Sequence, residues 1–433
     1  MKQAENGQGI LFEEVRKMRK RFKTVGLGLV AAGLSITLLL TGAIPAQAEN
    51  TKMVKIGLEA AWTGPLATTA KAAMEGLIDG VNDANERGFL PAGIKAEVIW
   101  EETRGEIPKA ITAYKRLKER GMVIKWTLLG TYAELTLPLH QRDEIPEFSF
   151  SSLTRGMISQ PERWAFGAMM GSPSEFLLFT KWVRENWTEE CPPRIGLIFY
   201  NHATGWVLLD ATKLADEMGF EYVGYEVVPM TVIDTSTEWL RMADRKVDWV
   251  YVGACAMPLV VLMKDAQRLE LQQKGIKLCT YAPGIDEDVI NAVRADANGW
   301  YVMSLISLYD IHPGVAVTRE IEKKHRGYVG RDVSWHHWAG ILEARTGIEA
   351  IRLAIEKVGY ENLNGRAVRD ALVSIRDFDG YGFLPYKTSM TEGKPYLADS
   401  MCVCQVRDEK IIRVSEYYRI DKSIEYVELG GRV

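Results

Sequence analysis

The stretch GLEAAWTGPLATTAKAAMEG, from Gly57 to Gly76, changes character in its middle. Its apolar start is typical of a buried strand, the Gly64-Pro65 pair requires a turn, and the alanine-rich run that follows favours a helix. A strand that ends in Trp62 and Thr63 directly before a helix N-terminus could hold a ligand, or it could only be the way the chain turns. The order of strand, turn and helix predicts the first half of a βαβ unit.

The same alternation continues on both sides of Pro173. Before it, we predict strands at 54–60, 94–100, 123–129 and 148–151, with helices at 66–87, 108–120 and from 133 onward. After it, we predict strands at 195–200, 222–228, 249–253 and 277–281, with helices at 174–187, 206–218, 238–244 and 258–273. Right-handed crossovers convert each series into a parallel sheet with helices on both faces. The sequence therefore predicts an α/β protein of two doubly wound, Rossmann-like lobes.

The last third of the chain is less regular. We predict a strand at 300–308, helices at 318–326, 335–358 and 365–375, and β-rich segments at 382–385, 400–406 and 411–418. Helices and strands that return after two complete α/β units indicate that the chain crosses between the lobes several times.

Length and charge limit the function. The chain has 433 residues, more than one hydrophobic core usually serves, which favours two lobes. Its formal net charge is only −4. No large basic surface is therefore available to follow a phosphate backbone, and we expect no nucleic-acid partner.

The N-terminus has the pattern of a secretory signal peptide. Six basic residues between 16 and 23 precede an apolar run at 25–44, and Ala46-Gln47-Ala48 follows with the small-x-small pattern of a cleavage site. We predict a signal peptide over residues 1–48, cleaved after Ala48, and a periplasmic mature protein. An uncleaved membrane anchor is the alternative, since about twenty apolar residues can span a bilayer, and Met18 is an alternative start.

The five cysteines give no clear site. An odd count leaves at least one thiol unpaired, and Cys402 and Cys404 are two apart in a strand-like run, an awkward spacing for a mutual disulfide. We interpret the cysteines as packing residues, with one long-range disulfide left open. The pair His336-His337 lacks metal-ligand spacing and is interpreted as packing or surface, so no metal site is expected.

From residue 54 to 418 the chain resembles the periplasmic substrate-binding proteins of ABC transporters, of the leucine/isoleucine/valine-binding type. The resemblance depends on the order and spacing of five segments: KIGLEAAWTGPLATTAKAAMEGLIDGVNDANERG at 55–88, IWEETRGEIPKAITAYKRL at 99–117, LLGTYAELTLPLH at 128–140, IPEFSFSSLTRGMIS at 145–159 and FDGYGFLPYKT at 378–388. It implies the type I periplasmic binding protein fold, with three hinge crossings between the lobes. It places residues 53–171 and 303–379 in the first lobe and residues 172–302 and 380–433 in the second.

The resemblance also implies a function. The protein would bind a small solute between its lobes and deliver it to the permease subunits of an ABC transporter, as a monomer, without catalysis and without a cofactor. Expected solutes are branched-chain or other amino acids, amides, and aromatic or aliphatic carboxylates.

The candidate ligand-binding residues lie in loops after predicted strands, where open α/β sheets bind ligands. They are Trp62, Thr63, Tyr132, Ala133, Glu134, Ser151, Ser152, Thr154, Thr204, Cys255 and Asp286. Family members that bind amino acids hold the carboxylate with backbone N–H groups and hydroxyls of the first lobe, and the ammonium with an acid and aromatics of the second. The hydroxyls of Ser151, Ser152 and Thr154 fit the first half of that arrangement.

Other positions depart from the family pattern. Glu134 stands where a serine-rich pair is common and would oppose a carboxylate, unless it points away as an ordinary first-turn residue. Thr204 and Cys255 stand where aromatic residues are expected, and Asp286 is the nearest substitute for the usual acid near Pro283. These departures weaken the case for a zwitterionic amino acid and favour a larger, less polar solute. His202 could contact it, although a lone loop histidine is usually solvated.

Two alternatives remain open at this point. A secreted α/β enzyme would need a nucleophile elbow or a phosphate loop, and neither motif occurs. A clamp that reports to a signalling partner instead of a permease has the same sequence features.

Overall fold

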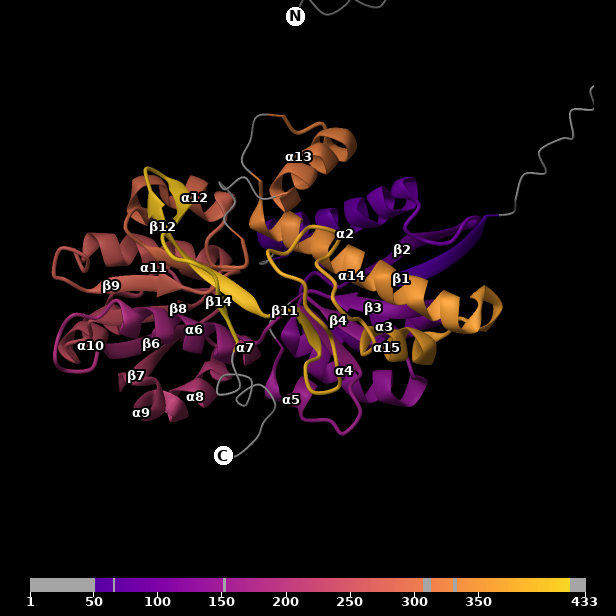
Figure 1. Ribbon diagram of the computed structural model, residues 1–433. Helices are drawn as coiled ribbons and strands as arrows, with labels where there is room; N and C mark the ends of the chain where they lie inside the picture. Colours follow the sequence, from indigo (N-terminus) through magenta and orange to yellow (C-terminus); the bar gives the residue numbers. More distant parts are fainter. Residues whose placement is uncertain (1–50, 65–66, 151–152, 307–312, 330–332, 421–433) are drawn as a thin grey trace, which may run out of the picture. The chain divides into compact units, whose positions relative to one another are not determined.

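The computed structural model describes residues 51–64, 67–150, 153–306, 313–329 and 333–420. These residues form two β-sheets flanked by helices (Figure 1). We call each sheet with its covering helices a lobe, the first lobe holding β1. The predicted signal peptide lies outside the described residues, and among those that are described no helix is long and apolar enough to cross a membrane.

The first sheet is wholly parallel, in the order β11-β5-β4-β3-β1-β2. Its strands are β1 (Lys52–Ala60), β2 (Ile94–Glu102), β3 (Met122–Thr127), β4 (Glu147–Ser149), β5 (Ala165–Met169) and β11 (Tyr396–Ala398). From β1, the strand next to the edge strand β2, the chain moves outward to β2 and then returns to β3 on the other side of β1. This reversal beside β1 is the topological switch point at which open α/β sheets bind ligands.

The second sheet repeats that plan in the order β13-β12-β10-β9-β8-β6-β7, with β14 also paired to β12. Its strands are β6 (Arg194–Tyr200), β7 (Glu221–Val228), β8 (Trp249–Gly253), β9 (Lys277–Thr280), β10 (Tyr301–Ser304), β12 (Ser400–Arg407), β13 (Lys410–Arg413) and β14 (Tyr418–Arg419). The run from β7 to β10 is parallel, and the C-terminal strands join antiparallel. The predicted pair of doubly wound lobes is confirmed.

The helices cover these sheets (Figure 1). They are α2 (Ala67–Arg87), α3 (Ile107–Glu119), α4 (Gly130–Asp143), α5 (Arg155–Ile158), α6 (Ser172–Glu185), α7 (Ala203–Trp206), α8 (Leu208–Ala211), α9 (Ala215–Met218), α10 (Ser236–Asp244), α11 (Ala256–Arg268), α12 (Glu287–Val293), α13 (Pro313–Arg326), α14 (Trp335–Val358) and α15 (Gly365–Leu372), with 3-10 turns η1 (Thr212–Leu214), η2 (Arg294–Ala297) and η3 (Tyr360–Asn362).

Glycines bring α14 directly against α2 in the first lobe (Figure 1). A Cβ atom on Gly76 would lie 2.1 Å from the carbonyl oxygen of His337, and one on Gly340 would lie 2.2 Å from that of Ala73. Because no larger residue fits at either position, the two backbones touch. This contact fixes where the first turn of α14 lies, and that turn carries His336.

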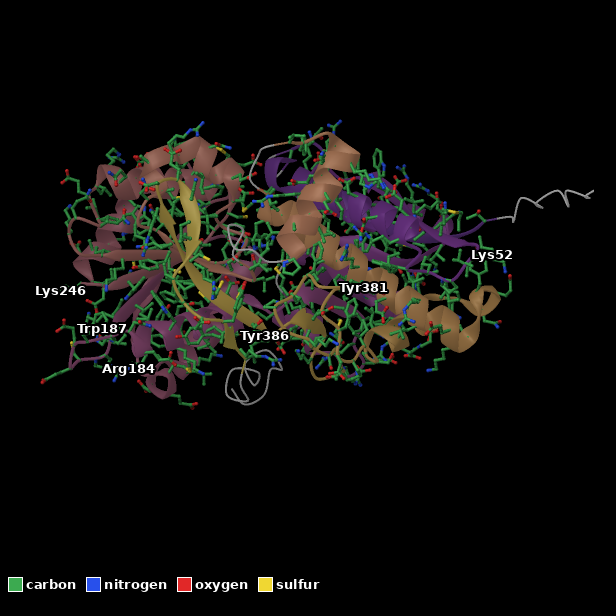
Figure 2. All side chains as sticks on the ribbon, turned by 45° about the horizontal axis from the view of Figure 1, so that its top comes forward. Lys52, Arg184, Trp187, Lys246, Tyr381 and Tyr386 are labelled. Atoms are coloured by element: carbon green, nitrogen blue, oxygen red, sulfur yellow. The ribbon has the colours of Figure 1, made fainter. Side chains whose placement is uncertain are left out.

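The structure also explains the glycines of the segment FDGYGF at 378–383. Gly380, Tyr381 and Gly382 have φ values of 66°, 57° and 84°, in the left-handed region that glycine adopts at little cost. Tyr381 accepts this conformation because its ring stacks on Phe89 at 4.2 Å and its hydroxyl donates to Oε2 of Glu349 at 2.6 Å. Figure 2 shows Tyr381 beside α14, the helix that carries Glu349.

A charged cluster lies inside the first lobe. Nζ of Lys125 on β3 is 3.1 Å from a carboxylate oxygen of Glu59 and 3.1 Å from one of Glu147, and the three side chains are completely buried. Lys125 also donates to Thr136 on α4 at 2.8 Å. The second carboxylate oxygen of Glu147 lies 3.2 Å from Nε2 of His140. The cluster therefore ties three central strands to the helix above them.

Several predicted elements differ from the structure. The helix expected at 206–218 is divided into the end of α7, α8, η1 and α9, because the hydrogen-bond pattern is interrupted at Val207 and changes to a 3-10 turn at Thr212–Leu214, although Val207, Thr212 and Ala215 keep helical dihedral angles. Residues 382–385 form turns instead of a strand, because glycines with positive φ precede them.

The expected lobe boundaries also differ in two places. Residues 380–433 were expected in the second lobe, yet their first strand, β11, belongs to the first sheet, where its three buried residues pair with β5. β10 continues in the second sheet to Ser304, past the expected boundary at 302. The last segment of the chain therefore contributes to both sheets.

The five cysteines form no disulfide with one another. The Sγ atoms of Cys402 and Cys404 are 3.9 Å apart, far beyond the S–S bond length of about 2.05 Å. Four of the five are at least half-buried, and only Cys191 is exposed.

Candidate functional site

A cavity lies where the carboxyl ends of strands from both sheets meet. Its volume is about 600 Å³, the open mouth included. The described residues that line it come from the loops after β3, β4, β6, β8 and β9 and from the first turns of α2 and α14; they are Thr69, Ala70, Leu128, Leu129, Phe150, Tyr200, His202, Cys255, Tyr281, Pro283 and His336. Both topological switch points therefore contribute to one site, as the fold requires of a ligand held between two such sheets.

Two tyrosines form most of the polar wall on the second lobe. The hydroxyl of Tyr200 lies 3.3 Å from the hydroxyl of Tyr281 and 3.3 Å from Oγ1 of Thr204. The thiol of Cys255 lies 3.9 Å from the same Tyr200 hydroxyl. Burial is the main cause that raises the pKa of both phenols and of the Cys255 thiol. These groups are therefore neutral near pH 7 and offer O–H and S–H groups, not anions.

His202 is neutral and has a defined tautomer. Burial lowers the pKa of its imidazole to about 4. Nδ1 accepts the backbone N–H of Thr204 at 3.3 Å, which caps α7, so the ring proton is on Nε2. Nε2 lies 2.9 Å from Oγ1 of Thr131 and donates to it. Since Thr131 belongs to the first lobe and His202 to the second, this hydrogen bond joins the lobes beside the cavity.

Asp286 and His336 form a second contact between the lobes. Oδ1 of Asp286 accepts the N–H of Val289 at 3.0 Å and so caps α12, and Oδ2 lies 2.6 Å from Nδ1 of His336. Burial by itself would raise the pKa of Asp286, but the charge and N–H of His336, with backbone N–H groups, lower the pKa below its usual value. Asp286 is therefore ionised and accepts the Nδ1–H of His336.

The ring of His336 is held in place by aromatic neighbours. Phe150 stacks on it with ring centroids 5.9 Å apart and 24° between the planes, and Trp335 meets it edge-on at 5.3 Å. His336 is only 1 % exposed, and its Nε2 has no hydrogen-bond partner among the described residues. This nitrogen is thus an unused polar group at the wall of the cavity.

The candidate residues of the second lobe lie at or next to this cavity. Cys255 lines it. Thr204 lies behind it and bonds to Tyr200 and His202, and Asp286 lies behind His336. That these residues contribute to solute binding stays a prediction.

The candidate residues of the first lobe lie elsewhere where the structure describes them. Trp62 and Thr63 donate their backbone N–H groups to Glu102, and Trp62 packs edge-on against Trp100 at 6.2 Å. Neither is among the described lining residues.

Tyr132, Ala133 and Glu134 belong to the first turns of α4 and not to the preceding loop, because that helix begins at Gly130. Tyr132 and Ala133 are buried in its core-facing side. The carboxylate of Glu134 accepts a hydrogen bond from the hydroxyl of Thr154, which pairs two candidates with each other. Ser151 and Ser152 lie outside the described residues.

Several lining residues were missed by the sequence analysis. Tyr200 is the last residue of β6 and Tyr281 directly follows β9, so their positions at strand ends were a usable signal. His336 was interpreted as packing or surface. Its partner Asp286 is 50 positions away in the chain, and nothing local indicates that contact.

The chain is similar to known proteins over most of its length. A family model described as periplasmic binding protein matches residues 53–410. The structure is similar to a branched-chain amino acid ABC transporter from Thermus thermophilus with bound valine, at 18 % identity and a TM-score of 0.77, over 87 % of this chain and 98 % of that one. No curated protein matches this chain in sequence.

Two further structures share the fold. A solute-binding protein of an ABC transporter from Rhodopseudomonas palustris BisB5, in complex with 3,4-dihydroxybenzoic acid, is 18 % identical with a TM-score of 0.71, over 85 % of this chain and 97 % of that one. A fatty acid ABC transporter substrate-binding protein from Thermomonospora curvata is 15 % identical with a TM-score of 0.72, over 86 % and 94 %. At these identities the likeness shows the fold alone.

Proposed function

Because this chain belongs to the periplasmic binding protein family, we propose that it captures a small solute between its lobes and delivers it to the permease of an ABC transporter. The observation that carries the proposal is the cavity lined by residues of both sheets. A solute there contacts both lobes only while they are together, so binding shifts the population of conformations towards the closed one. The permease would then recognise that closed form.

Two contacts in the structure favour this closed arrangement of the lobes. The hydrogen bonds Thr131–His202 and Asp286–His336 both join the lobes at the rim or wall of the cavity. Each is worth about 1 kcal/mol, somewhat more when one partner is charged. Such contacts support a clamp in which the solute adds the remaining free energy. They require no catalytic group, and we propose a binding protein without enzymatic activity.

The proposed location is the periplasm, after removal of residues 1–48. The signal pattern in the sequence supports it, and so does the family. N-terminal sequencing of the protein secreted by a bacterial host tests it: the expected first residue is Glu49.

A thermal-shift screen of the protein beginning at Glu49 tests the function. The neighbouring structures were solved with valine or 3,4-dihydroxybenzoic acid, or are named for fatty acids, so the screen includes amino acids, amides, and aromatic and aliphatic acids. A solute at 100 times its Kd stabilises the folded state by about 2.7 kcal/mol. We expect one chemical class to raise Tm in a saturable way. Stabilisation by no class, or conversion of the bound compound to a product detected by mass spectrometry, would overturn the proposal.

A further inference from the structure

The unused nitrogen of His336 is the starting observation. A buried polar atom without a hydrogen-bond partner is destabilising, and a ligand that bonds to it recovers that loss. Nε2 of His336 is buried, has no partner among the described residues and belongs to a residue that lines the cavity. It is therefore a group that a bound solute can complete.

The hydrogen bond of Nδ1 determines the role of Nε2 of His336 in hydrogen bonding. Nδ1 is 2.6 Å from Oδ2 of Asp286, and an ionised carboxylate accepts only, so Nδ1 carries a proton. In the neutral ring Nε2 is then an acceptor, whereas in the doubly protonated ring Nε2 carries the second proton and donates into the cavity. The positive ring and the negative carboxylate of Asp286 compensate each other, so this form buries no net charge.

The helices around the cavity favour an anion. Four helices of at least 13 residues begin at or beside lining residues: α2, α4, α11 and α14. None of them has an acidic residue in its first turn, a feature that they share with α3, α13 and α15 away from the cavity. The positive ends of the four helix dipoles are therefore left unneutralised towards the cavity.

The described lining residues offer no carboxylate to an ammonium group. No aspartate or glutamate is among the described lining residues. Asp286, which lies behind His336, already uses both oxygens, one for the N–H of Val289 and one for His336. The remaining wall is mostly aromatic and aliphatic, with Phe150 on one lobe and Tyr200 and Tyr281 on the other. Flat apolar groups fit between such rings.

From these observations, and on the basis of the proposed function, we propose that the solute is a carboxylate with an aromatic body and that protonated His336 donates its Nε2–H to that carboxylate. The rings of Phe150, Tyr200 and Tyr281 would contact the body of the solute. The hydroxyls of the two tyrosines would form hydrogen bonds with polar substituents on the aromatic ring of the solute. Asp286 would act as the positioning residue that keeps the proton on Nδ1.

Isothermal titration calorimetry with matched probes tests the inference on the unaltered protein. Benzoate, 4-hydroxybenzoate and 3,4-dihydroxybenzoate are each compared with their primary amides, which have the same shape but no charge; valine and leucine represent amino acids. We expect at least one acid to bind 10-fold or more tightly than its own amide and more tightly than either amino acid. An amide that binds as tightly as its acid, or binding of valine or leucine in preference to every acid, overturns the inference and leaves the proposed function standing. Binding of no probe of any class overturns the inference, and the broader thermal-shift screen then decides the proposed function separately.

Substitutions of His336 test whether its Nε2 binds the carboxylate of the solute. His336→Asn keeps a donor for Asp286 at the Nδ1 position and removes the group at Nε2, so we expect a 10-fold or greater loss of acid affinity and an acid-to-amide ratio near one. His336→Gln places a neutral donor near Nε2 and is expected to restore part of the affinity.

His337→Asn is the matched control. His337 is the next residue on α14 and is equally buried, but its ring nitrogens lie 3.1 Å from Asp79 and 3.3 Å from Glu322, and it is not among the lining residues. Its affinity should stay within twofold of the unaltered protein. If His336→Asn folds, as judged by circular dichroism, and keeps the full preference for the acid, the assignment of His336 is wrong. If it does not fold, the comparison of acids with amides still decides the solute class.

Discussion

The raised pKa of Glu175, a buried carboxyl next to the cavity, gives a quantitative prediction for the pH dependence of stability. This residue lies in the first turn of α6 and is only 2 % exposed. Its carboxyl accepts the backbone N–H of Ala282, which lies between the lining residues Tyr281 and Pro283. Burial raises the pKa of Glu175 to about 8, against hydrogen bonds that favour the charged form. The folded protein therefore holds this carboxyl protonated near pH 7.

The pKa sets both the sign and the size of the expected effect. In the unfolded chain the ordinary value is 4.5, so between about pH 4.5 and 8 the folded state binds more protons at this residue than the unfolded state does. The free energy of unfolding then falls as pH rises, by about 1.4 kcal/mol per pH unit. The stabilising contribution of protonated Glu175 is complete below pH 4.5 and is lost as pH rises through 8.

Urea unfolding followed by tryptophan fluorescence measures this slope. Because burial also raises the pKa of Glu147, to about 7, the unaltered protein alone does not isolate one residue. The comparison is with Glu175→Gln, which keeps the acceptor for Ala282 and cannot ionise. We expect the free energy of unfolding of the unaltered protein, minus that of the variant, to decrease by about 1.4 kcal/mol per unit between pH 5.5 and 7.5. A difference that stays constant over that range would refute the assignment.

Three further substitutions test other contacts. Lys125→Met leaves two buried carboxylates without their cation and should lower the free energy of unfolding by about 3–5 kcal/mol in urea; a loss below 1 kcal/mol would contradict the charged cluster. Gly340→Ala puts a Cβ 2.2 Å from the carbonyl oxygen of Ala73 and should cost about 1–3 kcal/mol in the same assay; unchanged stability would mean that the helices separate freely. Thr131→Val removes the hydrogen bond from His202 between the lobes and should weaken solute binding about 2- to 10-fold by calorimetry, with little change in Tm; full affinity would exclude a role in closure.

Much of the fold could be predicted from the sequence because its signals are local. The strand at 54–60 and the helix at 66–87 were recognised from hydrophobic period and turn residues, and the structure has β1 at Lys52–Ala60 and α2 at Ala67–Arg87. The region 206–218 was predicted wrongly as one helix, because its hydrophobic period does not reveal the turns that divide it. β11 lies within residues 380–433, which the family resemblance assigns to the second lobe, whereas its place in the first sheet depends on β5, more than 200 residues away.

The candidate site could be predicted only in part. Its location at strand ends follows from the α/β alternation, and the candidate Cys255 lines the cavity, while its role in binding stays a prediction. The loop after β1 looks like a ligand site in the sequence; in the structure Trp62 and Thr63 bond to Glu102, and their role in binding stays a prediction. A carboxylate on the neighbouring strand competes for the same backbone N–H groups, and the sequence does not show which partner is nearer.

The sequence by itself determined that this is an α/β protein of two doubly wound lobes, because strand and helix periods and turns are properties of consecutive residues, and five of its segments resemble the periplasmic binding protein family. Only the tertiary structure decided which side chains line the cavity. Thr131 meets His202 across 71 positions and Asp286 meets His336 across 50. Both contacts depend on where α4 and α14 begin, and for α14 that is set by its glycine contact with α2. The direction of a side chain at a strand or helix end follows from such packing and is not encoded in the residues beside it.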